Sequence, residues 1–89
     1  MNKKIYTVVR NYEHDGTTVR CFEDKEDAKI YALTLAQDDH DYFEFEEDFE
    51  ECCYEWENGD PIPHADGSFE LWGYECGNVV IDLLETPLT

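Results

Sequence analysis

The segment at residues 38–60, DDHDYFEFEEDFEECCYEWENGD, constrains the fold of this chain more than any other feature. It holds twelve carboxylates, contains no Lys or Arg, and carries aromatic residues between its acids. Like charges at this density repel one another, so the segment can fold only if its aromatic side chains are buried against the rest of the protein. The fold must therefore offer this segment an apolar surface on one side and water on the other.

Two interpretations of this segment are open. A helix places five apolar residues on one stripe, at spacings of 3, 4, 3 and 4: Tyr42, Phe45, Phe49, Cys52 and Trp56. A strand explains only the alternation over residues 43–45 and 52–56, although aromatic residues favour strands. The helix matches more positions, and the Asn-Gly pair at 58–59 followed by Pro61 is typical of a helix end. We therefore predict a helix over 41–57, with Trp56 buried in the core.

The rest of the chain predicts two hairpins and one more helix. Strands are expected at 4–12 and 17–22 around Asp15-Gly16, and at 68–75 and 78–85 around Gly77-Asn78. Asp24, followed by Asp27 and by apolar residues at helical spacing, predicts a helix over 25–37. The predicted fold is α+β: one domain, residues 1–89, ordered ββααββ, with two helices on one face of an antiparallel sheet.

The charge of the chain is unevenly distributed. All six Lys and Arg residues lie in the first 29 positions, where acids balance them, so the net charge of −17 belongs entirely to the remaining sixty residues. An apolar fraction of 42% is that of a folded protein rather than of a disordered acidic tail. No apolar run is long enough to span a bilayer or to serve as a signal peptide, so we expect a cytoplasmic protein without a membrane partner. The four cysteines are then expected to be free thiols.

Several kinds of chemistry are considered and set aside. Cys52, Cys53, Cys76 and His64 invite a zinc site, but adjacent cysteines lack the usual spacer of zinc-binding motifs. The residues DDHD at 38–41 lack the ligand spacing of a calcium loop. A cysteine could be combined on paper with His14, His40 or His64 as nucleophile and base, yet no local signature supports this. We therefore expect no metal, no cofactor, no catalytic residues and no enzymatic activity.

The acidic helix itself is the predicted binding surface. A helix over 41–57 would carry one exposed negative charge per ~2.8 Å, between the ~1.7 Å of duplex DNA and the ~3.4 Å of a single strand. Phe43 and Tyr54 would project from the acidic face, where exposed aromatic residues often become interface hot spots; packing of both on a neighbouring element is the other possibility. The candidate partner-binding residues are Glu44, Glu47, Asp48, Glu50, Glu51, Tyr54 and Glu55.

A small acidic domain with this charge pattern over residues 38–85 resembles the phage-encoded DNA-mimic inhibitors, which include anti-restriction proteins, uracil-DNA glycosylase inhibitors and some anti-CRISPR proteins. The resemblance implies a protein that acts in a host cytoplasm and inhibits a nucleic-acid-binding protein by occupying its basic groove. It implies no direct binding of nucleic acid. Two alternatives stay open: an acidic adaptor that does not mimic DNA, and a domain whose acids serve solubility alone, as in halophilic proteins. The target protein and the oligomeric state are also open.

Overall fold

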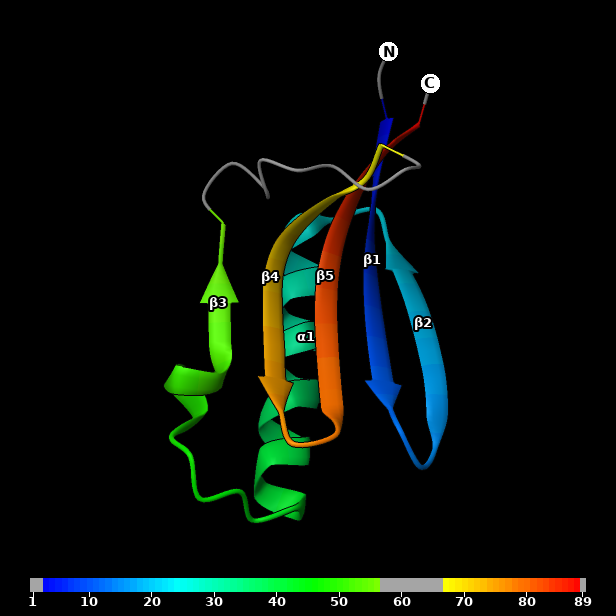
Figure 1. Ribbon diagram of the computed structural model, residues 1–89. Coiled ribbons are helices and arrows are strands. Elements are labelled where there is room, and N and C mark those ends of the chain that lie inside the picture. Colours follow the sequence, from blue (N-terminus) through cyan, green and yellow to red (C-terminus); the bar gives the residue numbers. More distant parts are fainter. Residues whose placement is uncertain (1–2, 57–66, 89) are drawn as a thin grey trace.

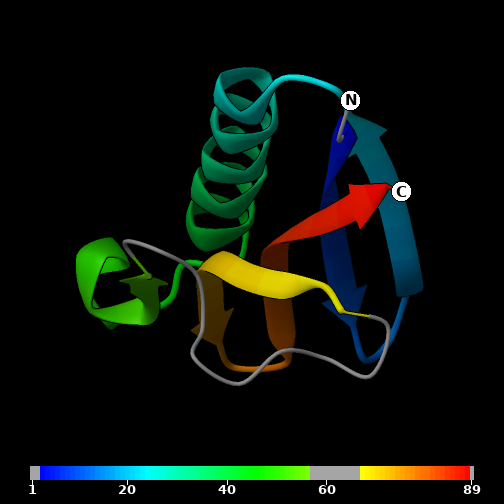
Figure 2. The ribbon, with the colours of Figure 1, turned by 90° about the horizontal axis from the view of Figure 1, so that it is seen from above.

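A computed structural model of the protein describes residues 3–56 and 67–88. Five strands form one antiparallel sheet in the order β2-β1-β5-β4-β3, and the helix α1 lies across one face of it (Figures 1 and 2). The elements, in chain order, are β1 (Lys3–Tyr12), β2 (Gly16–Phe22), α1 (Lys25–Tyr42), the 3-10 helix η1 (Phe49–Cys52), β3 (Cys53–Glu55), β4 (Phe69–Cys76) and β5 (Val79–Leu88).

Both predicted hairpins are confirmed. β1 and β2 pair around a turn that ends at Gly16, and β4 and β5 pair around Gly77. Each glycine has a positive φ, 91° and 58° respectively, which a residue without a Cβ adopts at low cost. β5 also pairs with β1 over the full length of both strands, so the first and last strands are neighbours within the sheet.

The predicted ββααββ order with two helices is wrong. In the described part of the chain α1 is the single α-helix, and it runs five residues beyond the predicted end at residue 37. In place of the predicted helix over 41–57, residues 41–55 form the end of α1, a loop at 43–48, η1 and β3, and residue 57 lies outside the described residues. The helical stripe needed Tyr42 and Trp56 in the core, yet their side chains are 79% and 38% exposed.

The pairing of β3 with β4 explains why residues 53–55 form a strand instead of a helix. β3 forms ladder hydrogen bonds with β4, with Cys53 opposite Tyr74 and Glu55 opposite Trp72. An exposed helix in the same place would have kept its like charges together at i,i+4 without any cation between them. Tertiary pairing therefore overrode the better helical periodicity.

Small residues let α1 approach the sheet. Ala28, Ala32 and Ala36 recur every four residues and are completely buried. The Asp24 carboxylate caps the helix by accepting hydrogen bonds from the backbone N–H groups of Glu26 and Asp27, as predicted. The core beneath the helix consists of side chains from the three central strands: Val8, Trp72, Tyr74, Val79, Ile81 and Leu83.

Candidate interaction surface

The acidic part of the chain follows one edge of the molecule. We call residues 44–55, which comprise most of the loop after α1 together with η1 and β3, the acidic edge; they lie beside β4 at the border of the sheet (Figure 1). All the predicted partner-binding residues are exposed there: Glu44, Glu47, Asp48, Glu50, Glu51, Tyr54 and Glu55. Glu46, which the prediction omitted, is exposed as well. The structure thus brings the predicted residues together on a loop, the 3-10 helix η1 and the strand β3 rather than on one α-helix.

Aromatic side chains hold the acidic edge against the core. Phe43, Phe45 and Phe49 are half-buried, whereas the acids between them face water. The Phe49 ring stacks on buried Tyr74 with a centroid distance of 5.6 Å, and the Phe45 ring lies 5.7 Å from that of His40. Burial of these rings offsets the repulsion among the acids, which explains why the two residue types are interleaved.

His40 connects the end of α1 to the acidic edge. It is buried, its Nε2 lies 2.8 Å from the Glu47 carbonyl oxygen, and its Nδ1 lies 2.9 Å from Tyr74 Oη. Because a carbonyl can only accept, Nε2 carries the proton and Nδ1 accepts from the tyrosine. Residues 38–41, whose spacing does not fit a calcium loop, belong to the last turns of α1, and His40 ties them to the loop that follows.

The cations of the described chain lie mainly away from the acidic edge. β2 and β3 form opposite borders of the sheet, so the strands that carry the basic residues lie far from β3 in sheet order. Arg10 pairs with Asp39 at the end of α1, and Lys4 pairs with Glu85 on β5. Among the described residues, Lys29 alone forms an ion pair with the acidic edge, through Glu55. The remaining carboxylates of the edge have no cation beside them in the described structure.

Tyr54 differs from the other predicted contact residues. Its ring lies over Gly73, where an added Cβ would clash with the end of the Tyr54 ring, so a side chain at this position would require the ring to move. Its hydroxyl lies 2.6 Å from Glu70 Oε1 and 3.2 Å from Asp82 Oδ1, on the sheet face opposite α1. Packing of Tyr54 on a neighbouring element was the second possibility considered from sequence.

One of the two carboxyl groups beneath Tyr54, that of Asp82, has a shifted pKa. Burial, followed by the hydrogen bond and negative charge of Glu70, raises the pKa of Asp82 to about 7. Near neutral pH the Asp82 carboxyl group therefore holds a proton for part of the time. Burial also raises the pKa of Tyr54 well above its usual range, so the phenol stays protonated and donates.

The cysteines divide into exposed and buried thiols. Cys21 is exposed on β2, whereas Cys52 and Cys76 are buried beside each other under the acidic edge. Cys53 points elsewhere and donates to the Phe49 carbonyl oxygen at 3.2 Å. Burial raises the pKa of Cys53 to about 11 and that of Cys76 to about 12. His64, which the sequence groups with these cysteines as a candidate zinc ligand, lies outside the described residues.

Comparisons of the chain with protein-family models, with curated proteins and with solved structures found no match. None of the helices in the described ranges has the length and apolar character required to cross a membrane.

Proposed function

We propose that the protein binds and inhibits a nucleic-acid-handling protein, with the acidic edge occupying that protein's basic groove. The observation that carries this proposal is the exposure of seven carboxylates within twelve residues, of which Glu55 is the one paired with a cation in the described structure. Such a surface attracts Lys- and Arg-rich grooves and steers their approach over distances of about a Debye length.

The acidic edge is not an α-helix, so the proposed mimicry of DNA does not rest on the charge spacing of a helix. Charge spacing calculated from the rise of a helix does not apply to a loop, a 3-10 turn and a short strand. The support for the proposal is instead the clustering of acids at positions 46–48 and 50–51, all facing water. Electrostatic complementarity to a basic groove requires a dense negative surface rather than a fixed helical spacing.

A charge-reversal experiment tests the proposal. Glu50→Lys/Glu51→Lys changes two exposed side chains that form no hydrogen bond or ion pair with the side chains of residues 3–56 and 67–88. The matched control, Glu13→Lys/Asp15→Lys, makes the same change in net charge on the β1–β2 turn. Immobilised protein is exposed to a bacterial lysate at increasing salt concentration, and the retained DNA- and RNA-binding proteins are identified.

We expect the parent and the control to retain the same nucleic-acid-handling protein with an affinity that falls steeply with salt, and the Glu50/Glu51 variant to lose it. Equal loss in both variants would mean that net charge acts alone, and the acids would then serve solubility. Retention of a basic protein that still binds nucleic acid while attached would indicate an acidic adaptor.

A further inference from the structure

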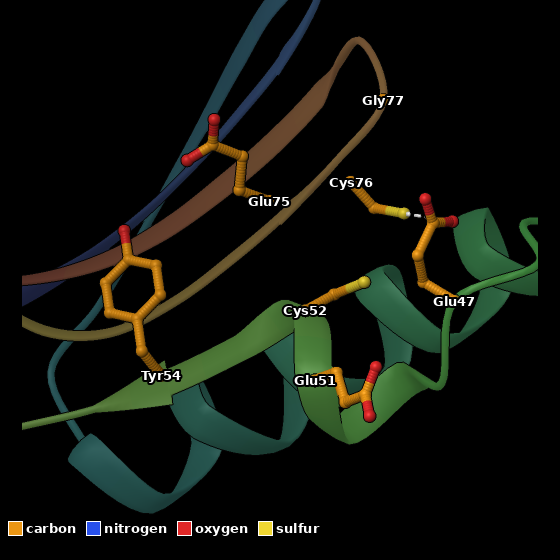
Figure 3. A pocket seen from close by; sticks show the side chains of 7 residues that line it. All are labelled: Glu47, Glu51, Cys52, Tyr54, Glu75, Cys76 and Gly77. Carbon is orange, nitrogen blue, oxygen red and sulfur yellow. Dashed lines mark hydrogen bonds between the residues drawn. The ribbon is translucent and has the colours of Figure 1, made fainter.

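The inner side of the acidic edge forms a cavity that contains two thiols. This cavity, of about 480 Å³, is lined by Glu47, Glu51, Cys52, Tyr54, Glu75, Cys76 and Gly77. Figure 3 shows the thiol of Cys76 directed at the Glu47 carboxylate and the thiol of Cys52 directed toward Cys76. The two cysteines are 8% and 5% exposed. Both thiols are therefore shielded from bulk water but lie beside a space that an ion can enter.

Three ligand atoms of the kinds that zinc prefers lie close together beside this cavity. The Sγ atoms of Cys52 and Cys76 and a ring nitrogen of His40 all lie within 4.8 Å of one another. Tetrahedral zinc, with Zn–S of ~2.3 Å and Zn–N of ~2.0–2.1 Å, places such atoms about 3.4–3.8 Å apart. Side-chain adjustments of about 1 Å or less would bring the three atoms to that separation. Cys52 precedes β3, Cys76 ends β4 and His40 lies in α1, so pairing and packing hold all three in place.

The hydrogen bonds of His40 resemble those of a metal-binding histidine. Its Nε2–H donates to the Glu47 carbonyl at 2.8 Å, which leaves the lone pair on Nδ1. Metal-bound histidines in proteins almost always donate their second ring N–H to a carbonyl or a carboxylate in this way. In the described structure the Nδ1 lone pair accepts from Tyr74 Oη, and a metal would take the place of that proton donor.

We propose that a zinc ion binds at the base of this cavity, between the thiolates of Cys52 and Cys76 and Nδ1 of His40. The Glu47 carboxylate, 3.6 Å from Cys76 Sγ, is the fourth ligand. Two thiols lose their protons to solvent as the dication binds, so the charge of the site is the same before and after binding. Thiolates select zinc over calcium or magnesium, and the surrounding acids Glu51 and Glu75 favour the entry of a cation.

The adjacency of Cys52 and Cys53, which does not match the spacing of zinc-binding motifs, does not prevent a site here. The two side chains diverge, since Cys53 donates to the Phe49 carbonyl and Cys52 faces the cavity. A zinc ion at this position would join α1, the start of β3 and the end of β4. It would thereby hold the acidic edge in place independently of any partner.

The test uses the reduced full-length chain and zinc itself. Native mass spectrometry at equimolar Zn²⁺ is expected to show one ion per chain, and thermal unfolding is expected to shift upward until EDTA is added. Substitution with Co²⁺ is expected to give the strong visible absorption of a tetrahedral thiolate site. Cys52→Ala and Cys76→Ala should abolish stoichiometric binding, whereas the neighbouring Cys53→Ala and the exposed Cys21→Ala should retain it.

A second measurement, made on the parent protein, tests the proposal even if the cysteine variants fail to fold. In the parent protein, zinc is expected to protect Cys52 and Cys76 from alkylation and to leave Cys21 reactive; peptide mapping distinguishes the three. The proposal is overturned if the folded, reduced parent binds no zinc, if Cys53→Ala loses binding as fully as Cys52→Ala, or if zinc protects neither buried thiol. A Cys52–Cys76 disulfide that forms in air, together with no zinc binding after reduction, would overturn it as well.

Discussion

Arg10 holds Asp39 with two hydrogen bonds, from Nε to Oδ2 at 2.6 Å and from Nη2 to Oδ1 at 3.0 Å. This contact joins β1 to the last turns of α1, and both side chains are less than one-sixth exposed. The hydrogen bond to Asp39 is the main reason that the pKa of Arg10 lies above its usual value. The ion pair places the Arg10 cation at the end of α1, whereas Lys29 is the cation paired with the acidic edge in the described structure.

Asp39→Asn is expected to destabilise the fold by ~3 kcal/mol, because the Arg10 guanidinium would remain largely buried without a counter-charge. Urea denaturation followed by far-UV circular dichroism measures the change. The control is Glu85→Gln, which breaks the more exposed pair with Lys4 and should cost less than ~1 kcal/mol. Equal costs for the two variants would show that the Arg10–Asp39 contact has no special role.

The two tryptophans provide a matched test of the core. Trp72 is 4% exposed and packs in the core of the sheet, whereas Trp56 is 38% exposed after the end of β3. Trp72→Ala should destabilise by ~3–5 kcal/mol, and Trp56→Ala by less than ~1 kcal/mol. Circular dichroism follows both without relying on tryptophan fluorescence. A larger loss of stability in Trp56→Ala than in Trp72→Ala would contradict the observed fold and agree with a helix over residues 41–57, in which Trp56 is buried.

Asp82 should make the stability of the fold depend on pH. Its pKa is raised to about 7 in the folded chain, against ~3.9 when unfolded, so the folded state binds more protons between these values. The contribution of Asp82 to stability is therefore fully present below pH ~4 and is lost as the pH rises through about 7. Asp82→Asn should remove this part of the pH dependence and melt above the parent at pH 8. The control Glu13→Gln, an exposed turn residue, should keep the slope of the parent; an unchanged slope in Asp82→Asn would contradict the shift.

A side chain at Gly73 should destabilise the fold while the Tyr54 ring is present. Gly73→Ala would push a methyl group into the Tyr54 ring and is expected to cost ~1–3 kcal/mol. Because the clash involves that ring, Gly73→Ala should cost much less when it is introduced into Tyr54→Ala. A double-mutant cycle measured by urea denaturation compares the two costs. Equal costs in both backgrounds would mean that the ring does not lie over Gly73.

The hairpins and the first helix were predictable from sequence because their signals are local. Asp15-Gly16 and Gly77-Asn78 mark turns, and Asp24 caps a helix, by interactions within a few residues. The fate of residues 43–55 was not predictable, because it depends on β3 pairing with β4 some twenty residues later. The convergence of His40, Cys52 and Cys76 depends on the same pairing, so spacing along the chain could not reveal it. Exposure of the acids at 44–55 was predictable, since carboxylates are rarely buried unless they are paired.

A competition titration tests the central claim most directly. The nucleic-acid-handling protein retained by the acidic edge is purified and bound to labelled duplex DNA or its own guide or substrate nucleic acid, and this chain is added in increasing amounts. Occupation of the basic groove predicts that the nucleic acid is displaced in full, and that the Glu50→Lys/Glu51→Lys variant displaces none at the same concentrations. A stable ternary complex, in which the partner holds both ligands at once, would contradict the account.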